Sequence, residues 1–150
     1  MPKIGLHHKD RTIRPRLVIA DDDALVRELV AAQLNDRFEC VGAVADALAA
    51  VELVVAERPD VVILDVNMPG GGAVHATREI RKRAPETAIV VLSVDEVWAD
   101  LIDLLNAGAM TYLRKGIDQA TLVNDISAAI QAHKGSSQRS PHDAGAAAAA

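Results

Sequence analysis

Five short apolar segments alternate with stretches of helical periodicity along most of this 150-residue chain. Several of these segments are apolar at every position, which is typical of strands buried on both faces of a parallel sheet. Strands that alternate with helices predict an α/β fold with a doubly wound, five-stranded parallel sheet and helices on both faces. The predicted strands cover residues 17–20, 38–44, 61–64, 89–92 and 110–113.

The segments between the strands have apolar residues at helical intervals. Proline follows the second and third of these segments and glycine follows the fourth, as expected near helix ends. The last segment carries an apolar stripe that we expect to face the sheet. The predicted helices cover residues 25–34, a stretch ending at Arg58, residues 73–83, residues 96–106 before Gly108, and a last helix whose inner stripe is Leu122, Ile126 and Ile130.

The length of the chain corresponds to one ordinary domain. We predict that this domain covers residues 16–133 and that residues 1–15 form a flexible, polar and basic segment before it. From Gly135 the composition changes to Ser, Gly, Pro and Arg, followed by a run of Ala. Residues 134–150 are therefore predicted to be a low-complexity tail.

Charge and composition argue against several classes of protein. The formal net charge is −5, whereas nucleic-acid binding needs a positive surface, and we interpret the basic residues of 78–83 as a solvated helix face. No apolar stretch is long enough to cross a bilayer, and the first residues lack the apolar region of a signal peptide. Cys40 is the only cysteine, so no internal disulfide can form. These features favour a cytoplasmic location.

Polar residues stand at the ends of four predicted strands: Asp21 and Asp22 after the first, Asp65 after the third, Ser93 after the fourth and Lys115 after the fifth. Right-handed crossovers bring the carboxyl ends of all strands to one edge, where doubly wound sheets bind ligands. Three carboxylates in one crevice repel one another unless a cation lies between them, and Mg²⁺ prefers oxygen ligands. The sequence therefore predicts a Mg²⁺ site at this edge.

The same edge is suited to phosphoryl transfer, because bound Mg²⁺ readily accepts a phosphate oxygen. Asp65 is the candidate nucleophile, which would form an aspartyl phosphate. Ser93 offers a hydroxyl donor and Lys115 a positive charge to the incoming phosphoryl oxygens. Catalysis of this kind consists mainly of positioning and charge neutralisation.

Each of these residues also has a purely structural interpretation. Asp is a preferred N-cap, so Asp22 or Asp23 is able to cap the first helix. Asp65 is able to start a turn, Ser93 to cap the fourth helix, and Lys115 to be a surface lysine. We favour the functional interpretation because all these positions lie at strand ends. We expect Asp23 to be the N-cap, which leaves the two preceding aspartates for the metal.

Four segments carry a resemblance to a known family: RLVIADDDALVREL, PDVVILDVNMPGGG, AIVVLS and GAMTYLRKG. Over residues 16–133 the chain resembles the receiver domains of bacterial response regulators, and its MPGGG and HATREIRKRAPET segments are most similar to receivers of the NarL/LuxR type. The resemblance implies a flavodoxin-like (βα)5 fold with strand order 2-1-3-4-5. It also implies a phosphoprotein of a two-component phosphorelay.

The resemblance assigns roles to single residues. Asp65 would be the phospho-acceptor. Asp22 would be the main acidic metal ligand with Asp21 beside it, and the backbone carbonyl of Asn67 would complete the protein ligands of the Mg²⁺ ion.

The resemblance also implies a conformational switch. Ser93 would bond the attached phosphoryl group and Lys115 would pair with it. In the family, the hydroxyl on strand four moves toward the phosphate while an aromatic residue on strand five turns inward, and the aromatic residue here is Tyr112. Physically, a phosphoryl group adds nearly two negative charges and strong acceptors, which would bias two arrangements of the loop after Ser93.

The leading hypothesis is a stand-alone receiver that accepts a phosphoryl group from a sensor histidine kinase or phosphotransfer protein and signals to a downstream protein target. It would be a signalling domain rather than an enzyme, promoting only its own phosphorylation and autodephosphorylation. A homodimer through the fourth and fifth helices is a hypothesis by analogy. The alternatives are the regulatory module of a NarL/LuxR-type DNA-binding regulator and a phosphorylation-independent pseudo-receiver that binds partners. An aspartate-nucleophile phosphatase fits poorly, because its D-x-D motif is followed closely by Thr or Val, which residues 21–25 do not match well, and because no cap insertion that selects a substrate is present.

Overall fold

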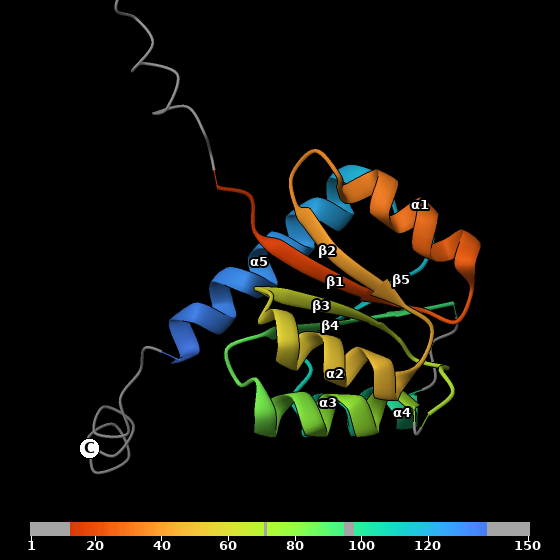
Figure 1. Ribbon diagram of the computed structural model, residues 1–150, viewed down its shortest axis with the longest axis vertical. Coiled ribbons are helices and arrows are strands. Elements are labelled where there is room, and N and C mark those ends of the chain that lie inside the picture. Colours follow the sequence, from red (N-terminus) through yellow and green to blue (C-terminus); the bar gives the residue numbers. More distant parts are fainter. Residues whose placement is uncertain (1–12, 71, 95–97, 138–150) are drawn as a thin grey trace, which may run out of the picture.

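The computed structural model describes residues 13–70, 72–94 and 98–137. Strands and helices alternate through this part of the chain (Figure 1). They are β1 (Arg16–Ala20), α1 (Ala24–Leu34), β2 (Glu39–Val44), α2 (Ala47–Glu57), β3 (Val61–Asp65), α3 (Gly72–Arg83), β4 (Ala88–Ser93), α4 (Trp98–Ala107), β5 (Thr111–Arg114) and α5 (Gln119–Ser137).

The strands form one parallel sheet in the order β2-β1-β3-β4-β5. The predicted doubly wound, flavodoxin-like fold with strand order 2-1-3-4-5 is thereby confirmed. Strand β3 lies at the centre and pairs with β1 on one side and β4 on the other. All residues of β3 and β4 are buried, which agrees with sequences that are apolar up to the last residue of each strand.

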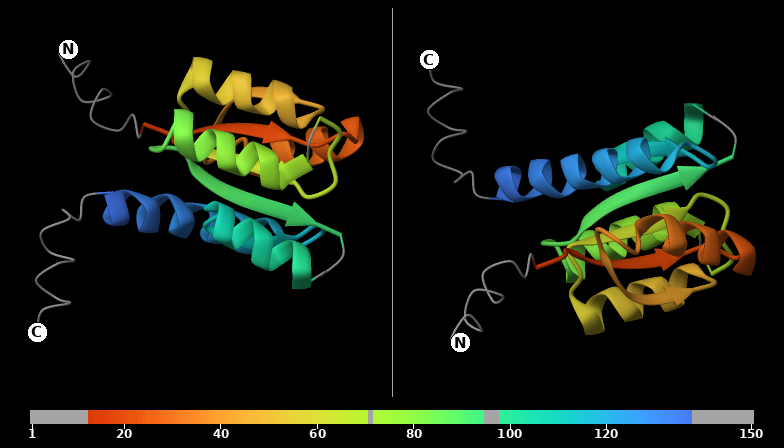
Figure 2. Two further views of the ribbon diagram at one scale, coloured as in Figure 1. Left: turned by 90° about the horizontal axis from the view of Figure 1, so that it is seen from below. Right: turned by 90° about the horizontal axis from the view of Figure 1, so that it is seen from above.

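Helices cover each face of the sheet, and Figure 2 shows α2 and α5 on opposite sides of it. Successive side chains of a strand point to opposite faces, so strands such as β1, β3 and β4 contribute to two apolar clusters. Helices α2, α3 and α4 cover one face, where they pack against strand residues such as Val62, Leu64 and Val91. Helices α1 and α5 cover the other face, where they pack against strand residues such as Ile19 and Ile63. The predicted inner stripe of the last helix is confirmed, since Leu122, Ile126 and Ile130 are buried.

Helix α1 begins as the sequence predicts but buries only part of its apolar surface. The Asp23 carboxylate is the N-cap and accepts hydrogen bonds from the backbone N–H groups of Leu25 and Val26. Val30 is buried, whereas Leu25 and Leu29 are 62% and 56% exposed. Leu25 and Leu29 lie one turn apart on the outer side of the helix, because the apolar stripe is wider than the strip that the sheet covers.

Some boundaries differ from the sequence-based ones. Strand β5 begins at Thr111, and α5 continues to Ser137, past the predicted domain end at residue 133. The predicted start of the fourth helix at residue 96 lies outside the described residues, as do residues 1–12 and 138–150 of the two predicted terminal segments. The domain limits therefore stay predictions. None of the helices in the described ranges combines the length and apolar character that crossing a bilayer requires.

We interpret the basic residues of 78–83 from the sequence as a solvated helix face, and Arg81 departs from this interpretation because it is half-buried. Its Nη2 donates to the backbone carbonyls of Pro85 and Thr87, at 3.0 and 2.8 Å. Burial lowers the pKa of this guanidinium. The side chain turns inward because these carbonyl groups, between α3 and β4, require donors once they are covered. Its alkyl stem lies against Gly108, at the end of α4.

Replacing Gly108 with Ala is expected to destabilise the protein by about 2 kcal/mol, because a non-glycine residue is strained at positive φ. The φ angle of Gly108 is +117°, and an added Cβ would overlap the Cδ and Cγ atoms of Arg81. Urea unfolding measures the change. Gly135→Ala is the matched control: Gly135 lies in α5 with open space around it, so Ala should raise stability slightly. Equal stability of Gly108→Ala and the wild type would contradict this account.

Candidate functional site

Asp21 lies directly after β1 at the carboxyl edge of the sheet, and its side chain is almost fully buried. Its backbone N–H donates to the carbonyl of Val44 at 3.0 Å, which continues the pairing with β2 by one residue. Its Oδ1 accepts from the backbone N–H of Asp23 at 2.9 Å. The next residue, Asp22, is exposed. The turn between β1 and α1 therefore presents one buried and one exposed carboxylate at the same place.

Asp65 is the last residue of β3 and is 5% exposed. It pairs in register with Leu92 of β4, whose carbonyl accepts from the backbone N–H of Val66 at 3.2 Å. The backbone N–H of Asn67 donates to the Asp65 carboxylate. The central strand and the turn that follows it thus hold this carboxylate at the carboxyl edge, beside Asp21.

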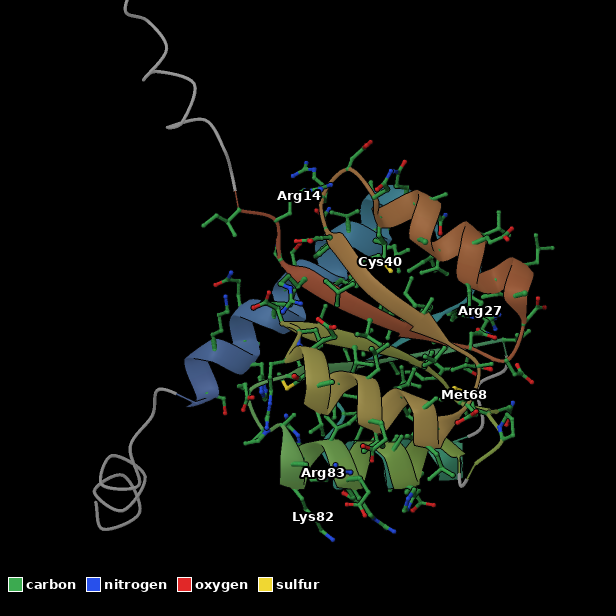
Figure 3. All side chains as sticks on the ribbon, in the orientation of Figure 1. Arg14, Arg27, Cys40, Met68, Lys82 and Arg83 are labelled. Carbon is green, nitrogen blue, oxygen red and sulfur yellow. The ribbon has the colours of Figure 1, made fainter. Side chains whose placement is uncertain are left out.

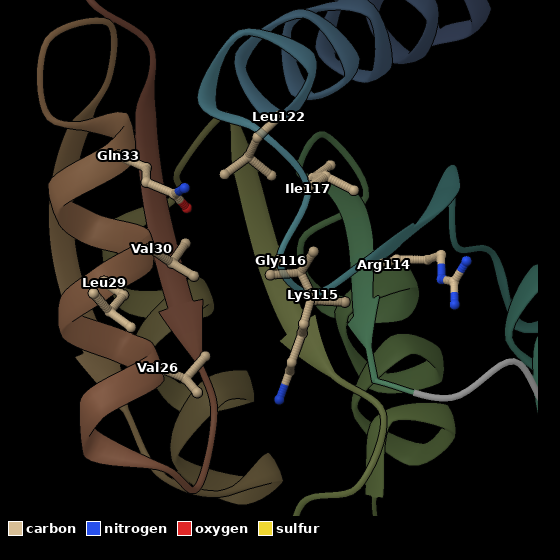
Figure 4. A pocket seen from close by; sticks show the side chains of 10 residues that line it. Val26, Leu29, Val30, Gln33, Arg114, Lys115, Gly116, Ile117 and Leu122 are labelled. Atoms are coloured by element: carbon tan, nitrogen blue, oxygen red, sulfur yellow. The ribbon is translucent and has the colours of Figure 1, made fainter.

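Lys115 follows β5 and joins the two buried carboxylates. Its Nζ lies 2.7 Å from Oδ2 of Asp21 and 3.0 Å from Oδ1 of Asp65. Its backbone N–H donates to the carbonyl of Ser93 at 2.9 Å, which anchors the loop to the end of β4. Figure 4 shows the Lys115 side chain extending from this loop into the space that faces Val26 of α1. The lysine supplies the positive charge that two buried carboxylates require.

The acidic group has the composition and spacing of a site for a hard divalent cation. Carboxylate oxygens of Asp21, Asp22 and Asp65 all lie within 4.8 Å of one another. Ligands of an octahedral Mg²⁺ ion are about 3 Å apart when adjacent and about 4 Å when opposite, so a small movement would bring these oxygens around one ion. Asp22 is exposed, which leaves a solvent side for water molecules or a phosphate oxygen. The three aspartates therefore fit Mg²⁺.

The environment of the site raises the pKa of both Asp65 and Lys115. Burial raises the pKa of Asp65, and the nearby Asp21 charge acts in the same direction, against the opposing effects of Lys115 and the Asn67 amide. For Lys115, burial acts to lower the pKa, but the bonds to Asp21 and Asp65 outweigh it and the pKa is raised. The lysine thus keeps its charge at neutral pH, while Asp65 holds its proton more readily than an ordinary aspartate.

On acidification, Mg²⁺ binding is expected to weaken at a higher pH than it would if Asp65 had the pKa of an ordinary aspartate. A proton and the cation compete for Asp65, whose pKa is raised above 3.8. The same shift means that Asp65 adds stability below pH 3.8 and that this contribution is lost as the pH rises through the raised pKa. Calorimetric Mg²⁺ titrations between pH 7 and pH 4 measure the affinity. Unchanged affinity down to the ordinary carboxyl pKa would contradict the assignment of Asp65 as a ligand.

The remaining predicted site residues lie around this group. Ser93 ends β4, one residue past the partner of Asp65, and is 3% exposed. Asn67 is exposed in the loop after β3. Tyr112 of β5 is half-buried and packs against the apolar cluster beneath α2, α3 and α4.

One residue in contact with the site was not found from the sequence. Nη1 of Arg27 donates to the backbone carbonyl of Asp21 at 2.7 Å. Its position in the first turn of α1, where a basic residue is unfavourable, is the sequence signal that marks it.

The strand order and the acidic carboxyl edge together define a doubly wound α/β domain with a flavodoxin-like fold. The sequence model of the response regulator receiver domain matches residues 17–127. The chain therefore belongs to the response regulator receiver family.

Relatives of known name agree with this assignment. The chain is 36% identical over 118 residues to the transcriptional regulatory protein DegU of Brevibacillus brevis, covering 77% of this chain and 50% of that protein. It is 34% identical to PdtaR of Mycobacterium tuberculosis, covering 81% of this chain and 59% of that protein. The chain thus spans only about half the length of the curated relatives it matches.

Solved structures give the same result. The signal receiver domain of NarL from Mycobacterium tuberculosis superposes with a TM-score of 0.76 and 29% identity, covering 79% of this chain and 97% of that domain. A LuxR-family two-component response regulator from Aurantimonas gives 0.74 and 30%, covering 79% of this chain and 86% of that one. The predicted resemblance to NarL/LuxR-type receivers is confirmed.

Proposed function

We propose that this receiver accepts a phosphoryl group on Asp65 in a Mg²⁺-dependent reaction and signals by changing its contacts with other proteins. The observation that carries the proposal is the pairing of one lysine with two buried aspartates. Nζ of Lys115 is 2.7 Å from Asp21 and 3.0 Å from Asp65, and Asp22 completes the acidic group. A nucleophilic carboxylate, acidic cation ligands and a mobile positive charge are the parts that phosphoryl transfer requires.

In this proposal Asp21, Asp22 and the backbone carbonyl of Asn67 hold Mg²⁺ together with Asp65. The ion, when bound, neutralises negative charge on the phosphoryl oxygens. An oxygen of the Asp65 carboxylate attacks the phosphorus of a phosphohistidine. The new O–P bond forms while the P–N bond breaks, and the donor imidazole leaves with the electron pair of that bond.

Two further residues act on the phosphoryl group in the product. Lys115 is already 3.0 Å from Oδ1 of Asp65, so a small shift of Nζ would pair it with a phosphoryl oxygen. The Ser93 hydroxyl, at the end of the neighbouring strand, would donate to another oxygen. These two interactions replace water around the new charge, which is how preorganised sites stabilise transferring phosphoryl groups.

The switch would follow from the same contacts. Movement of Ser93 toward the phosphoryl group would change the loop after β4 and the packing of Tyr112, which is half-buried on β5. The altered surface of α4, β5 and α5 would contact a downstream protein target or a second copy of the chain. Light scattering after size exclusion, with and without beryllofluoride, tests the dimer, and two monomeric samples would reject it.

The phosphoryl donor would be a sensor histidine kinase or a phosphotransfer protein, as in two-component systems generally, and the domain would act in the cytoplasm without binding nucleic acid itself. A second candidate is the regulatory module of a longer DNA-binding regulator. It is supported by the relatives, since the matched DegU is named a transcriptional regulatory protein and is about twice the matched length. The mass of the protein isolated from its native cells distinguishes these two roles.

Intact-protein mass spectrometry after incubation with acetyl phosphate tests the proposed chemistry. We expect one phosphoryl adduct in the presence of Mg²⁺ and none in the presence of EDTA. A folded protein that binds Mg²⁺ but forms no adduct would reject the phospho-acceptor role. The remaining interpretation would then be a phosphorylation-independent binding module.

A further inference from the structure

Arg27 is a cation in an electrostatically unfavourable position. It is the fourth residue of α1, and the first turn of a helix carries a positive partial charge that favours acidic side chains. The side chain is half-buried, and Figure 3 shows it at the edge of the sheet where β1 ends, the same edge as Met68. A compensating interaction is therefore expected for this guanidinium.

The backbone carbonyl of Asp21 provides that interaction. Nη1 of Arg27 lies 2.7 Å from this oxygen. The Asp21 N–H bonds to β2, and the pairing of β1 with β2 ends at Ala20 and Val44, so the Asp21 carbonyl lies beyond the last residue pair of that ladder. A covered carbonyl needs a donor, and a bond from a charged donor is stronger than one between neutral groups. Arg27 thus replaces the missing strand neighbour with a side chain from the following helix.

Asp21 is consequently held at four atoms. Its N–H bonds to Val44, its Oδ1 to the N–H of Asp23, its Oδ2 to Lys115 and its carbonyl to Arg27. The carbonyl belongs to the peptide unit that joins Asp21 to Asp22. Because a peptide unit is planar, fixing its carbonyl also fixes its N–H and the direction in which the chain enters Asp22.

Asp22 depends on this backbone orientation more than its neighbour does. Asp21 is 2% exposed and is enclosed by the fold, whereas Asp22 is exposed and lacks such packing. Its carboxylate oxygen nevertheless lies within 4.8 Å of those of Asp21 and Asp65. The geometry of the turn therefore has to bring the Asp22 carboxylate toward the other two.

We propose that Arg27 is a positioning residue of the metal site: by holding the Asp21–Asp22 peptide it directs the Asp22 carboxylate toward the cation. This inference rests on the proposed Mg²⁺-dependent function. Residues that support metal ligands without touching the metal commonly change metal affinity when they are replaced. Arg27 acts in this way through a backbone carbonyl rather than through a carboxylate.

Charge alone predicts the opposite behaviour, which makes the inference testable by the sign of an effect. Arg27 places a positive charge close to a binding site for a dication, so removing that charge would strengthen Mg²⁺ binding if simple repulsion dominated. If positioning dominates, removing the guanidinium weakens Mg²⁺ binding in spite of the lost repulsion. The two explanations cannot give the same direction.

The experiment compares the Mg²⁺ dissociation constants of the wild type, Arg27→Met, Arg27→Lys and Lys82→Met by titration calorimetry at constant ionic strength. We expect the dissociation constant of Arg27→Met to rise about tenfold, in the lower part of the range seen for residues that support metal ligands. Arg27→Lys keeps a donor group and the charge. Its dissociation constant is expected to lie between those of Arg27→Met and the wild type. Lys82→Met removes an exposed cation from α3 and is expected to leave the constant unchanged.

Urea unfolding without Mg²⁺ shows that each variant is folded under the titration conditions. Unchanged or tighter Mg²⁺ binding by Arg27→Met would overturn the inference. Equal weakening in Lys82→Met would also overturn it, because the effect would then not depend on the bond from Arg27 to the Asp21 carbonyl. A wild-type protein that binds no Mg²⁺ would instead reject the proposed function, so the two failures are distinguishable.

Discussion

The Asp65→Asn protein is expected to take up no phosphoryl group from acetyl phosphate, whatever the Mg²⁺ concentration. The carboxamide has no nucleophilic oxygen of comparable reactivity, and it removes one of the three charges that would hold the cation. At neutral pH without Mg²⁺, the same variant is expected to be at least as stable as the wild type. The raised pKa of Asp65 shows that its ionised form is disfavoured in the folded protein, and asparagine removes that charge.

Asp23→Asn is the matched control for this prediction. It makes the same Asp-to-Asn change at a position only two residues from Asp21. Asp23 caps α1, and because asparagine is an equally good N-cap, the helix should be unaffected. Intact-mass measurement should show a normal adduct on Asp23→Asn. An adduct that persists in Asp65→Asn would mean that another residue accepts the phosphoryl group, and peptide mapping would locate it.

Replacing Lys115 with Met is expected to destabilise the metal-free protein by about 3 kcal/mol at neutral pH, because breaking a buried ion pair leaves uncompensated charge. The Lys115 side chain is 16% exposed and those of Asp21 and Asp65 are 3% and 6% exposed, so solvent screens the three groups poorly. The urea midpoint in EDTA measures this effect. Lys134→Met is the control: its Nζ lies 3.9 Å from Asp60 and its side chain is 55% exposed, so the change should be below about 0.5 kcal/mol.

Mg²⁺ should restore part of the stability that Lys115→Met loses. A ligand that binds only the folded state stabilises it, and here the cation would also supply the positive charge that the two buried carboxylates have lost. The stabilisation by saturating Mg²⁺ is therefore expected to be larger for the variant than for the wild type. If Lys115→Met is as stable as the wild type in EDTA, the lysine does not carry the electrostatic role assigned to it.

Much of this fold was predictable because the decisive signals are local. Strands β3 and β4 are apolar at nearly every position, and this pattern belongs to strands buried on both faces. The convergence of Asp21, Asp65 and Lys115 follows from topology: parallel strands end at one edge whatever their separation in sequence. The N-cap role of Asp23 was also predictable, since capping depends on residues within one helical turn.

Features that depend on side-chain direction were not predictable in this way. The basic stretch before Pro85 gives no sign that Arg81 alone turns inward. Only the tertiary fold decides whether the carbonyl groups that Arg81 bonds are exposed or covered. Likewise, helical periodicity does not show that Leu25 and Leu29 lie outside the strip covered by the sheet. The bond from Arg27 to a backbone oxygen leaves no pattern of complementary side chains in the sequence.

The central place of β3 has a consequence for how the domain opens. This strand is hydrogen-bonded on both sides and fully buried, so its amide hydrogens should exchange with solvent only through global unfolding. Asp22 and the loop residue Asn67 are exposed and belong to segments that open at lower cost. We therefore expect Asp65 to end the slowest-exchanging strand of the described chain, while its exposed surroundings at Asp22 and Asn67 exchange faster. Added charge on Asp65 would be accommodated by rearrangement of those surroundings, and the sheet would keep its register.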